Sequence, residues 1–385
     1  LNYRNPIVLN EMIFNMLYLA NQGVDIVRLD AVPYIWKQLG TNCRNLPQVH
    51  TIVRIMRMIC EIVCPGVLLL GEVVMAPEKV VPYFGTVEKP ECHLLYNVTT
   101  MASTWHTVAT KDVSLLRRQL DIISELPRDY VFQNYLRCHD DIGWGLDYEY
   151  LENFGIQEVP HKKYLNDFLT GKYPDSFARG ELYNDDPRLG DARLCGTTAS
   201  LCGIERFGFE GNQEGVDRAV RYDITLHAFM LSQSGIPVIY SGDEIGQVND
   251  YSYKDDPEKS DDSRYLHRGK FDWKLAENRH DPATVQGKLF PVLNKLEHIR
   301  SSHGIFNSNV PIHTIDTWDN SILAFVREND EEKFIGIYNF SENDKVAWIN
   351  EEDGMYTDLI SGREMEAKGV QIPAFGCYWL CRNKQ

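Results

Sequence analysis

The sequence predicts an α/β fold built on a parallel sheet, followed by a smaller antiparallel β domain. Short apolar runs of strand length alternate with helical segments through most of the chain. Several of these runs end in a charged residue, and α/β barrels place their chemistry at the carboxyl ends of their strands. From about Gly304 the pattern changes to short alternating runs without a helical period. We therefore expect the C-terminal part of a catalytic (β/α)8 barrel in residues 1–303 and an antiparallel β-sandwich in residues 304–385.

The first helix and strand are indicated by a change of period. Apolar residues recur at helical spacing up to Gly23, a residue that commonly ends helices. These apolar positions are Met12, Ile13, Met16, Leu17 and Ala20. Residues 24–30 then form a short β-branched run that finishes on Asp30, which predicts a strand with a carboxylate at its end.

A second helix and strand repeat this arrangement. The helix is predicted to end at Pro65 and Gly66. Its apolar face consists of Val49, Ile52, Val53, Met56, Ile59 and Val63. Residues 67–72 follow as an apolar strand that finishes on Gly71 and Glu72.

Three more strands of this kind are predicted further along the chain. They are residues 92–97, residues 131–137 before His139-Asp140-Asp141, and residues 236–242 after a helix over residues 219–231. Residues 142–201 interrupt the alternation and have little periodicity. So long a segment inside a compact domain usually forms a functional loop or subdomain.

The predicted C-terminal domain consists of short runs separated by turn residues. The runs are residues 322–327, 333–340, 346–349 and 376–381. Only five barrel-type strands are found before them, whereas a closed barrel of this type has eight. Because the chain opens at Leu1 directly into a helix, we expect the first part of the catalytic domain to be missing from this sequence.

Charge and composition argue against two classes of function. The 385 residues include 39 Lys and Arg against 55 Asp and Glu, a formal charge of −16. Nucleic acids and anionic lipids require clustered positive charge, so neither is an expected partner. No apolar stretch reaches the length of a membrane span. No oligomeric state follows from these residues.

The nine cysteines are scattered and odd in number, and none forms a C-x-x-C pair. We therefore expect neither a disulfide framework nor a zinc site. Most of them lie beside apolar residues and are interpreted as small buried hydrophobic side chains. A reducing cytoplasm is the expected compartment.

Three predicted strands place carboxylates at one end of the sheet, namely Asp30, Glu72 and Asp140 with Asp141. Arg28 shares a strand face with Asp30 and is suited to keep it ionised as a nucleophile. The apolar residues around Glu72 favour a protonated acid. A nucleophilic carboxylate and a carboxylic acid are the catalytic pair of a retaining glycosidase.

Other interpretations of these residues stay open. A single Asp at a strand end is often only a turn residue or a helix cap. The cluster His139-Asp140-Asp141 could bind a metal ion, although adjacent residues on a strand face opposite ways. The charge-rich run from Lys254 to Arg264 could be a solvated loop.

Three of these motifs resemble the α-amylase superfamily, glycoside hydrolase family 13. They are Val27-Arg28-Leu29-Asp30-Ala31-Val32, Leu70-Gly71-Glu72-Val73 and His139-Asp140. The resemblance implies that Asp30 is the nucleophile, Glu72 the general acid/base and Asp140 the transition-state stabiliser. Arg28 would hold the nucleophile and His139 would contact the same sugar. The five strands would then be strands four to eight of the barrel.

Within this superfamily the chain is similar to the amylosucrase family. The segments that carry the similarity are Ile35 to Thr41, Asn45 to Gln48, His139 to Trp144, Ser176 to Gly180 and Lys259 to Arg264. Amylosucrases transfer glucose from sucrose to α-1,4-glucan and release fructose. The similarity therefore implies these two sugars as partners. We expect no cofactor, because two carboxylates suffice for double displacement, while a structural Ca²⁺ stays open but is not evident in the sequence.

The same resemblance assigns roles to three further residues. Residues 142–201 would be a subdomain inserted after strand seven, in which Asp141 and Arg193 pair across the acceptor entrance. Arg264 would help to close the glucose-binding end. The sequence departs from the family at Cys138, where many relatives have Asn, and it lacks the strand-three motif.

The alternatives to this function fall into two classes. Sucrose hydrolase, sucrose phosphorylase and α-amylase share the superfamily and differ in the acceptor. The second class is a truncated, inactive protein that only binds carbohydrate. The presence of Asp30, Glu72 and Asp140 argues against this alternative.

Overall fold

The computed structural model describes residues 1–75, 77–186, 190–349 and 353–384. The chain forms two compact units. The first consists of Leu1–Thr99 and Pro127–Gln133, and the second of Thr100–Leu126 and Asn134–Gln385.

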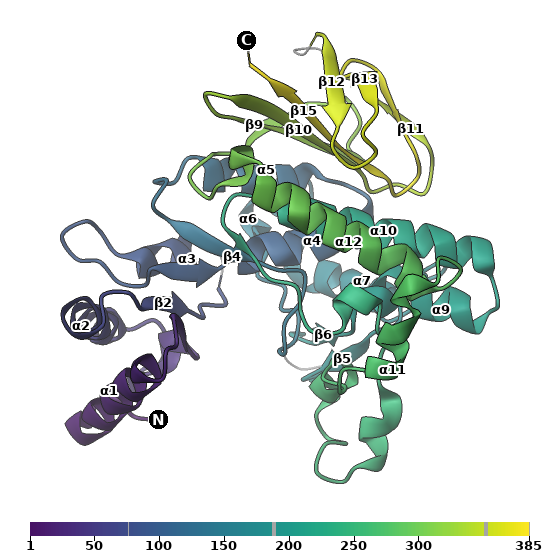
Figure 1. Ribbon diagram of the computed structural model, residues 1–385. Helices are drawn as coiled ribbons and strands as arrows, with labels where there is room; N and C mark the ends of the chain where they lie inside the picture. The colour runs from purple at the N-terminus through teal and green to yellow at the C-terminus, as the bar shows by residue number, and fades with distance from the viewer. Residues whose placement is uncertain (76, 187–189, 350–352, 385) are drawn as a thin grey trace. The chain divides into compact units, whose positions relative to one another are not determined.

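Helices and strands alternate through most of the chain (Figure 1). The helices are α1 (Pro6–Asn21), α2 (Pro47–Val63), α3 (Pro77–Val80), α4 (Val98–Thr110), α5 (Ser114–Ser124), α6 (Tyr148–Glu152), α7 (Glu158–Leu169), α8 (Thr198–Cys202), α9 (Ile204–Phe209), α10 (Gln213–Ser232), α11 (Trp273–Ala276) and α12 (Val285–Ser302). The first seven strands are β1 (Ile26–Leu29), β2 (Leu68–Gly71), β3 (Leu94–Tyr96), β4 (Val131–Asn134), β5 (Glu181–Tyr183), β6 (Arg193–Cys195) and β7 (Ile236–Pro237). The last eight are β8 (His313–Ile315), β9 (Ile322–Glu328), β10 (Glu332–Asn339), β11 (Lys345–Ala347), β12 (Met355–Asp358), β13 (Glu364–Glu366), β14 (Val370–Ile372) and β15 (Cys377–Asn383).

The part of the chain before the C-terminal sheet is an α/β fold with a parallel sheet in the strand order β1-β2-β3-β4-β7, which confirms the predicted fold class. The register pairs Leu29 of β1 with Gly71 of β2. Asp30 and Glu72, the next residues, therefore leave the sheet at the same edge. Gly71 has no room for a side chain, since a Cβ atom there would lie 2.6 Å from the Cys92 sulfur.

The first unit has its own apolar core between its helices and strands. Helix α2 contributes Ile52, Met56 and Cys60, which are buried with Val27 of β1 and Leu69 of β2. These three residues recur every four positions along α2, so one face of the helix covers the sheet. The core holds β1 and β2 in place and thereby fixes the strand ends that carry Asp30 and Glu72.

Two expected strands are shorter than predicted. Strand β4 ends at Asn134 and β7 at Pro237, whereas residues 131–137 and 236–242 were expected. Beyond Asn134 the backbone bonds to side chains instead of a neighbouring strand, for example from the Trp105 indole to the Leu136 carbonyl at 2.7 Å. Asp140 therefore lies in a loop after β4, not at the end of a strand.

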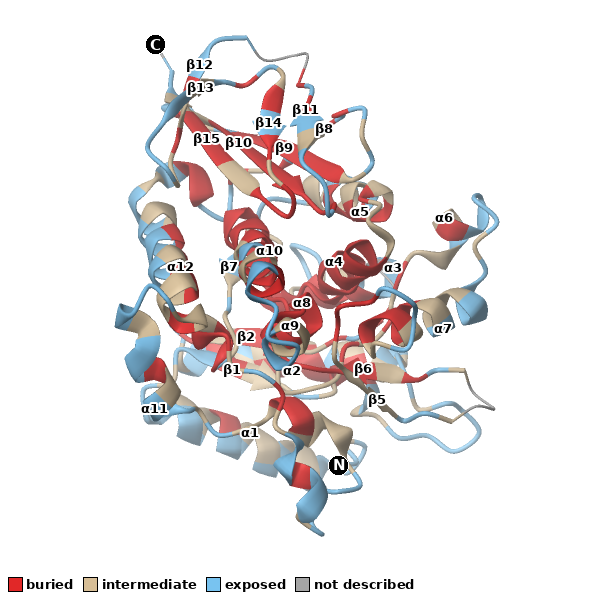
Figure 2. Cartoon of the chain, turned by 90° about the vertical axis from the view of Figure 1, so that its right-hand side faces the viewer, coloured by how far each residue is buried: buried red, intermediate tan, exposed pale blue. Residues whose placement is uncertain are grey.

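The described residues of segment 142–201 contain more regular secondary structure than the sequence pattern indicates. They include α6, α7 and α8, and the hairpin of β5 and β6. The apolar face of α7 is short, with Leu165, Phe168 and Leu169 buried. Helix α10, which follows, is buried over most of its length (Figure 2).

The C-terminal part is an antiparallel sheet in the order β13-β12-β15-β10-β9-β8, with a second sheet of β11 and β14. This arrangement confirms the predicted antiparallel domain. Strand β9 is buried on both faces, because Ile322 to Arg327 are all buried. The domain boundary at residues 303 and 304 stays a prediction.

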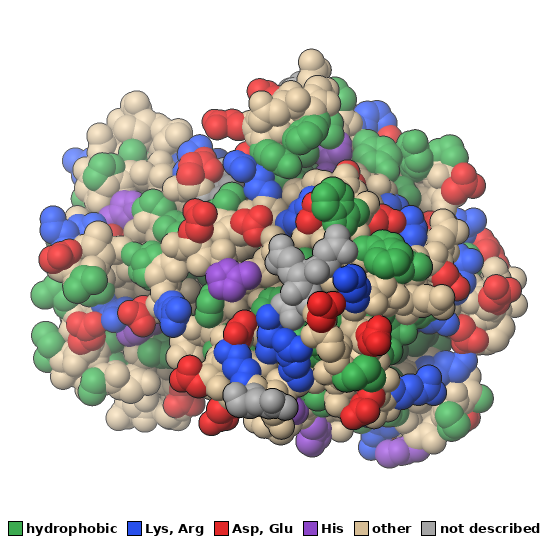
Figure 3. Space-filling view, turned by 90° about the horizontal axis from the view of Figure 1, so that it is seen from above, with side chains coloured by type: hydrophobic (Ala, Val, Ile, Leu, Met, Phe, Trp, Pro, Cys, Tyr) green, Lys and Arg blue, Asp and Glu red, His purple; other side chains and the backbone are tan. Residues whose placement is uncertain are grey.

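Charged side chains of both signs are interspersed on the face shown in Figure 3. None of the helices in the described part of the chain has the length and apolar character needed to cross a membrane. All nine cysteines are free thiols, and five of them are buried.

Candidate active site

The first group of candidate residues lies where β1 and β2 end, in the first unit. Arg28 makes an ion pair with Asp30, with 2.7 Å between Nη1 and Oδ1. Its Nη2 lies 3.4 Å from Oε2 of Glu72, and its Nε donates to the Tyr96 hydroxyl at 3.1 Å. One guanidinium therefore contacts both carboxylates, and Tyr96 of β3 orients it.

The surroundings of Arg28 keep its guanidinium positively charged. Burial alone would lower the pKa of Arg28, but the bond to Asp30 and the charge of Glu72 raise it above its ordinary value. Arg28 thus stays positively charged at any working pH, as expected for a residue that holds a carboxylate nucleophile.

The two carboxylates have different surroundings. The Asp30 side chain is 76% exposed, whereas that of Glu72 is 18% exposed. The Ala31 amide donates to Oε2 of Glu72 at 2.7 Å, so this oxygen is already an acceptor. A proton on Glu72 would therefore reside on Oε1. The contact with Arg28 is a polar feature that the expected apolar setting of Glu72 did not include.

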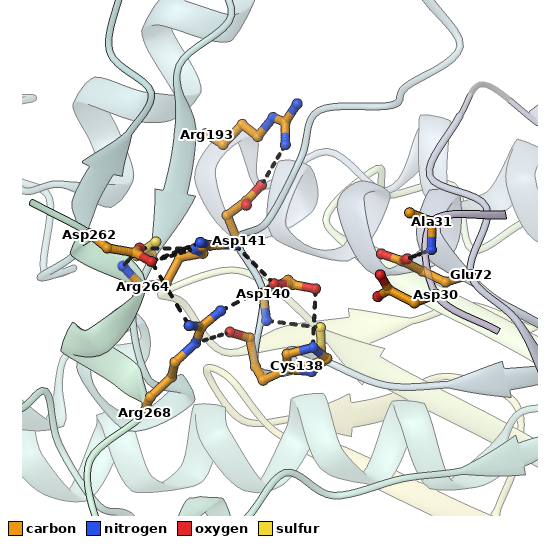
Figure 4. Close-up of polar contacts among 12 residues, drawn as sticks. Asp30, Ala31, Glu72, Cys138, Asp140, Asp141, Arg193, Asp262, Arg264 and Arg268 are labelled. Carbon is orange, nitrogen blue, oxygen red and sulfur yellow. Dashed lines mark hydrogen bonds and ion pairs between the residues drawn. The ribbon is translucent and has the colours of Figure 1, made fainter. Parts of the chain in front are cut away.

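The second group lies in the second unit and centres on Asp140 (Figure 4). Oδ1 of Asp140 lies 3.2 Å from both Arg264 and Arg268, and Oδ2 lies 3.2 Å from Nε2 of His139. Arg264 also makes an ion pair with Asp262, at 2.7 Å between Nη2 and Oδ2. Two arginines and two aspartates therefore form a charge-balanced cluster.

Asp141 does not join this cluster. Its Oδ2 lies 3.3 Å from Nη1 of Arg193 on β6, which is the pair that the sequence resemblance implied. Burial raises the pKa of Asp141, and the charge of Arg193 opposes this shift. The Asp141 side chain is 9% exposed against 42% for Arg193, so the open side of the pair is cationic.

A buried ion pair helps to hold together the segments that carry Asp140 and Arg264. Arg137 and Asp243 are each 2% exposed and contact one another at 2.8 Å. The Thr198 hydroxyl donates to Asp243 at 3.0 Å, and Arg137 donates to the His267 carbonyl at 3.1 Å. The segment that carries Arg264 and Arg268 is thereby tied to the residue three positions before Asp140.

His267 joins three segments through its imidazole ring. The Gly196 amide donates to Nδ1 at 3.1 Å, and Nε2 lies 3.4 Å from the His139 carbonyl. Because Nδ1 accepts a hydrogen bond, the proton belongs on Nε2. Burial and the nearby charge of Arg137 lower the pKa of His267 to about 3, so the ring is neutral at ordinary pH.

This pKa predicts a pH dependence of stability. The pKa of His267 is about 3 in the folded protein and about 6.5 in the unfolded chain. Between these two pH values the unfolded chain binds a proton that the folded protein does not bind. We therefore expect His267 to lower the free energy of unfolding as the pH falls below about 6.5, by up to about 1.4 kcal/mol per pH unit. Urea unfolding from pH 7 to 5 should show a shallower dependence for His267→Gln. An unchanged slope would contradict the burial of a neutral ring.

The geometry does not support a metal ion bound jointly by residues 139–141, because the Asp141 carboxylate makes an ion pair with Arg193. Within the described ranges, only His303, Glu332 and Cys381 bring three suitable side chains within reach of one ion. His303 Nδ1 lies 2.5 Å from Glu332 Oε1. This is a hydrogen-bond separation, so His303 and Glu332 form a hydrogen-bonded pair, with the Cys381 sulfur 3.9 Å from the same carboxylate oxygen.

Sequence reasoning missed Tyr96, Asp243, His267 and Arg268, and gave Asp262 no role. His267 and Arg268 lie three and four residues after Arg264, where the charge-rich run from Lys254 ends, so their position was a usable signal. Tyr96 ends a short apolar strand and had no distinguishing pattern.

Known proteins share this architecture. Residues 1–142 match the sequence model of the alpha-amylase catalytic domain. Glucosylglycerate phosphorylase of Escherichia coli K12 is 28% identical over 382 residues, which are 99% of this chain and 64% of that protein. The enzyme of the same name from Spirochaeta thermophila is 31% identical over 294 residues, 75% of this chain and 46% of the relative. The chain thus spans less than two thirds of either relative.

A solved structure supports the fold. Sucrose 6F-phosphate phosphorylase from Thermoanaerobacter thermosaccharolyticum superposes with a TM-score of 0.66 at 19% identity, covering 96% of this chain and 64% of that one.

Proposed function

We propose that the protein is a retaining α-glucosyl transferase, on the premise that residues 1–142 match the sequence model of the alpha-amylase catalytic domain. The observation that carries the proposal is the single Arg28 guanidinium in contact with both Asp30 and Glu72. The two carboxylates follow the aligned ends of strands β1 and β2. The Asp30 side chain is exposed, whereas that of Glu72 is largely buried.

In this mechanism Asp30 attacks the anomeric carbon of the donor and forms a β-glucosyl ester. Glu72 donates the proton on Oε1 to the departing oxygen, because Oε2 accepts the Ala31 amide. Glu72 then takes the proton of the incoming acceptor hydroxyl while the acceptor oxygen attacks the anomeric carbon, which breaks the ester bond, releases the Asp30 carboxylate and gives net retention. Asp140 would bind sugar hydroxyls in the transition state, with His139 beside it.

For substrates, we propose sucrose as the donor and an α-1,4-glucan as the acceptor. The amylosucrase-like segments support this choice, as does the Asp141–Arg193 pair at 3.3 Å. The charges also support a neutral acceptor, since Arg193, Arg264 and Arg268 each contact a carboxylate. A phosphate acceptor, being an anion, would need cationic side chains that are not already paired with carboxylates.

The curated relatives favour a second candidate, phosphorolysis. Both relatives reported above are named glucosylglycerate phosphorylase. In such a reaction inorganic phosphate would take the glucosyl group from Asp30. Hydrolysis, with water as the acceptor, uses the same first step.

One assay of the full-length protein separates these outcomes. We expect sucrose with glycogen to yield fructose and longer glucan chains, and EDTA to leave the rate unchanged because two carboxylates suffice for the chemistry. Glucose 1-phosphate formed from sucrose or glucosylglycerate with phosphate would instead establish phosphorolysis. Free glucose as the main product would establish hydrolysis, and no turnover of any α-glucoside would contradict the proposal as a whole.

A further inference from the structure

Arg268 is a residue of the Asp140 cluster to which no role has yet been given. We propose that Arg268 is a positioning residue, which fixes the backbone at His139 and the carboxylate of Asp140 together. The kinetic part of this inference rests on the proposed function, because it takes Asp140 as the transition-state stabiliser.

The side chain of Arg268 makes two different contacts with neighbouring residues. Its Nε donates to the His139 carbonyl at 2.5 Å, and its Nη2 lies 3.2 Å from Oδ1 of Asp140 (Figure 4). Its guanidinium lies 5.4 Å from the ring centre of Tyr265, and its side chain is 21% exposed. A planar group bound to a backbone carbonyl and to the next carboxylate restricts both position and orientation.

Arg264 cannot replace it. Although Nη1 of Arg264 also lies 3.2 Å from Asp140, its Nε and Nη2 hold Asp262 at 2.9 and 2.7 Å. Arg268 lies farther from Asp262, at 4.0 Å. The charge of Arg264 is therefore shared mainly with Asp262, and that of Arg268 is directed to Asp140.

The backbone around His139 depends on such side chains. The ladder of β4 ends at Asn134, so the carbonyl of His139 lies outside the sheet. Its second contact, with Nε2 of His267, is longer at 3.4 Å. Removing Arg268 would leave this carbonyl with the weaker partner and the cluster with one uncompensated negative charge.

The test uses Arg268→Ala in the full-length protein with an α-glucosyl fluoride donor. Misplacement of a catalytic group by about 1 Å can cost about 100-fold in rate, so we expect kcat to fall by about this factor. KM should change little in comparison. Millimolar guanidinium should restore part of kcat, because the missing group is a planar cation. Arg268→Lys should stay slow, since an ammonium group cannot make both contacts in the same geometry.

Arg279→Ala is the matched control. Arg279 also donates to a backbone carbonyl, that of Ala276 at 2.8 Å, and it lies near the ring of Phe290. Its kcat should equal that of the parent with and without guanidinium. If Arg268→Ala keeps the parent kcat, raises only KM or shows no rescue, the inference is wrong.

A crystal structure of Arg268→Ala provides a measurement that does not depend on the reaction. We expect the His139 carbonyl and the Asp140 carboxylate to move while the Arg264–Asp262 pair stays. Unchanged positions of both groups would overturn the positioning role even if the enzyme proved to have another substrate. If the parent protein is inactive but Arg268→Ala shows the expected displacement, only the proposed function is overturned.

Discussion

Asp30→Asn in the full-length protein is expected to lower kcat on the order of 10⁴-fold or more, the scale seen when a covalent nucleophile is removed. The amide that replaces the carboxylate cannot form the glucosyl ester, and Arg28 loses the anion that it contacts at 2.7 Å. The loss should be equally severe with a glucosyl fluoride donor. Initial rates with sucrose and with the fluoride measure both effects.

Glu72→Gln serves as the informative comparison for Asp30→Asn. It removes the proton donor but leaves Asp30, so the fluoride, which needs little protonation, should still react. Glu78→Gln is the neutral control in the same unit, since that side chain is 67% exposed. Equal losses in Glu72→Gln and Asp30→Asn with the fluoride would contradict the separate roles of the two carboxylates.

Asp243→Ala is expected to lower the free energy of unfolding by about 3–5 kcal/mol, which is the usual cost of breaking a buried ion pair. Arg137 would be left as a buried charge without its carboxylate, at 2% exposure. Urea unfolding monitored by tryptophan fluorescence measures the change. The activity should fall as well, because Arg137 also binds the His267 carbonyl.

Asp217→Asn is the control for this effect. Asp217 makes an ion pair with Lys288 at 2.6 Å, but the two side chains are 45% and 30% exposed, so water screens the pair. Its loss should cost less than about 1 kcal/mol. A comparable change in both variants would show that burial does not set the strength of the Arg137–Asp243 pair.

The sequence pattern was sufficient for the parts of the site that depend on local structure. A β-branched run ending in Asp30 and an apolar run ending in Glu72 predicted two strands and their exit points, and the register confirms that these ends align. Periodicity works here because the strands and α2 bury one continuous face against each other.

The contacts of Asp140 were beyond such reasoning. Arg264 and Arg268 lie 124 and 128 residues further along the chain. No local pattern shows which arginine will reach a carboxylate at that separation. The end of β4 was misplaced for the same reason, since distant side chains bind the carbonyls that a neighbouring strand was expected to bind.

The helices of the inserted segment were missed because their apolar faces are short. Helix α7 begins EVPHKK and has Pro160 in its first turn, where proline is tolerated but interrupts a search for periodicity. Only its second half, with Leu165, Phe168 and Leu169, is clearly buried.

The central claim is that Asp30 forms the covalent intermediate, and mass spectrometry of trapped protein tests it most directly. Full-length Glu72→Gln would be loaded with α-glucosyl fluoride, quenched in acid and digested. The account predicts one glucosyl group on the peptide that contains Asp30, and none in the double variant Asp30→Asn/Glu72→Gln. A glucosyl group on any other peptide, or a first product of inverted configuration, would contradict it.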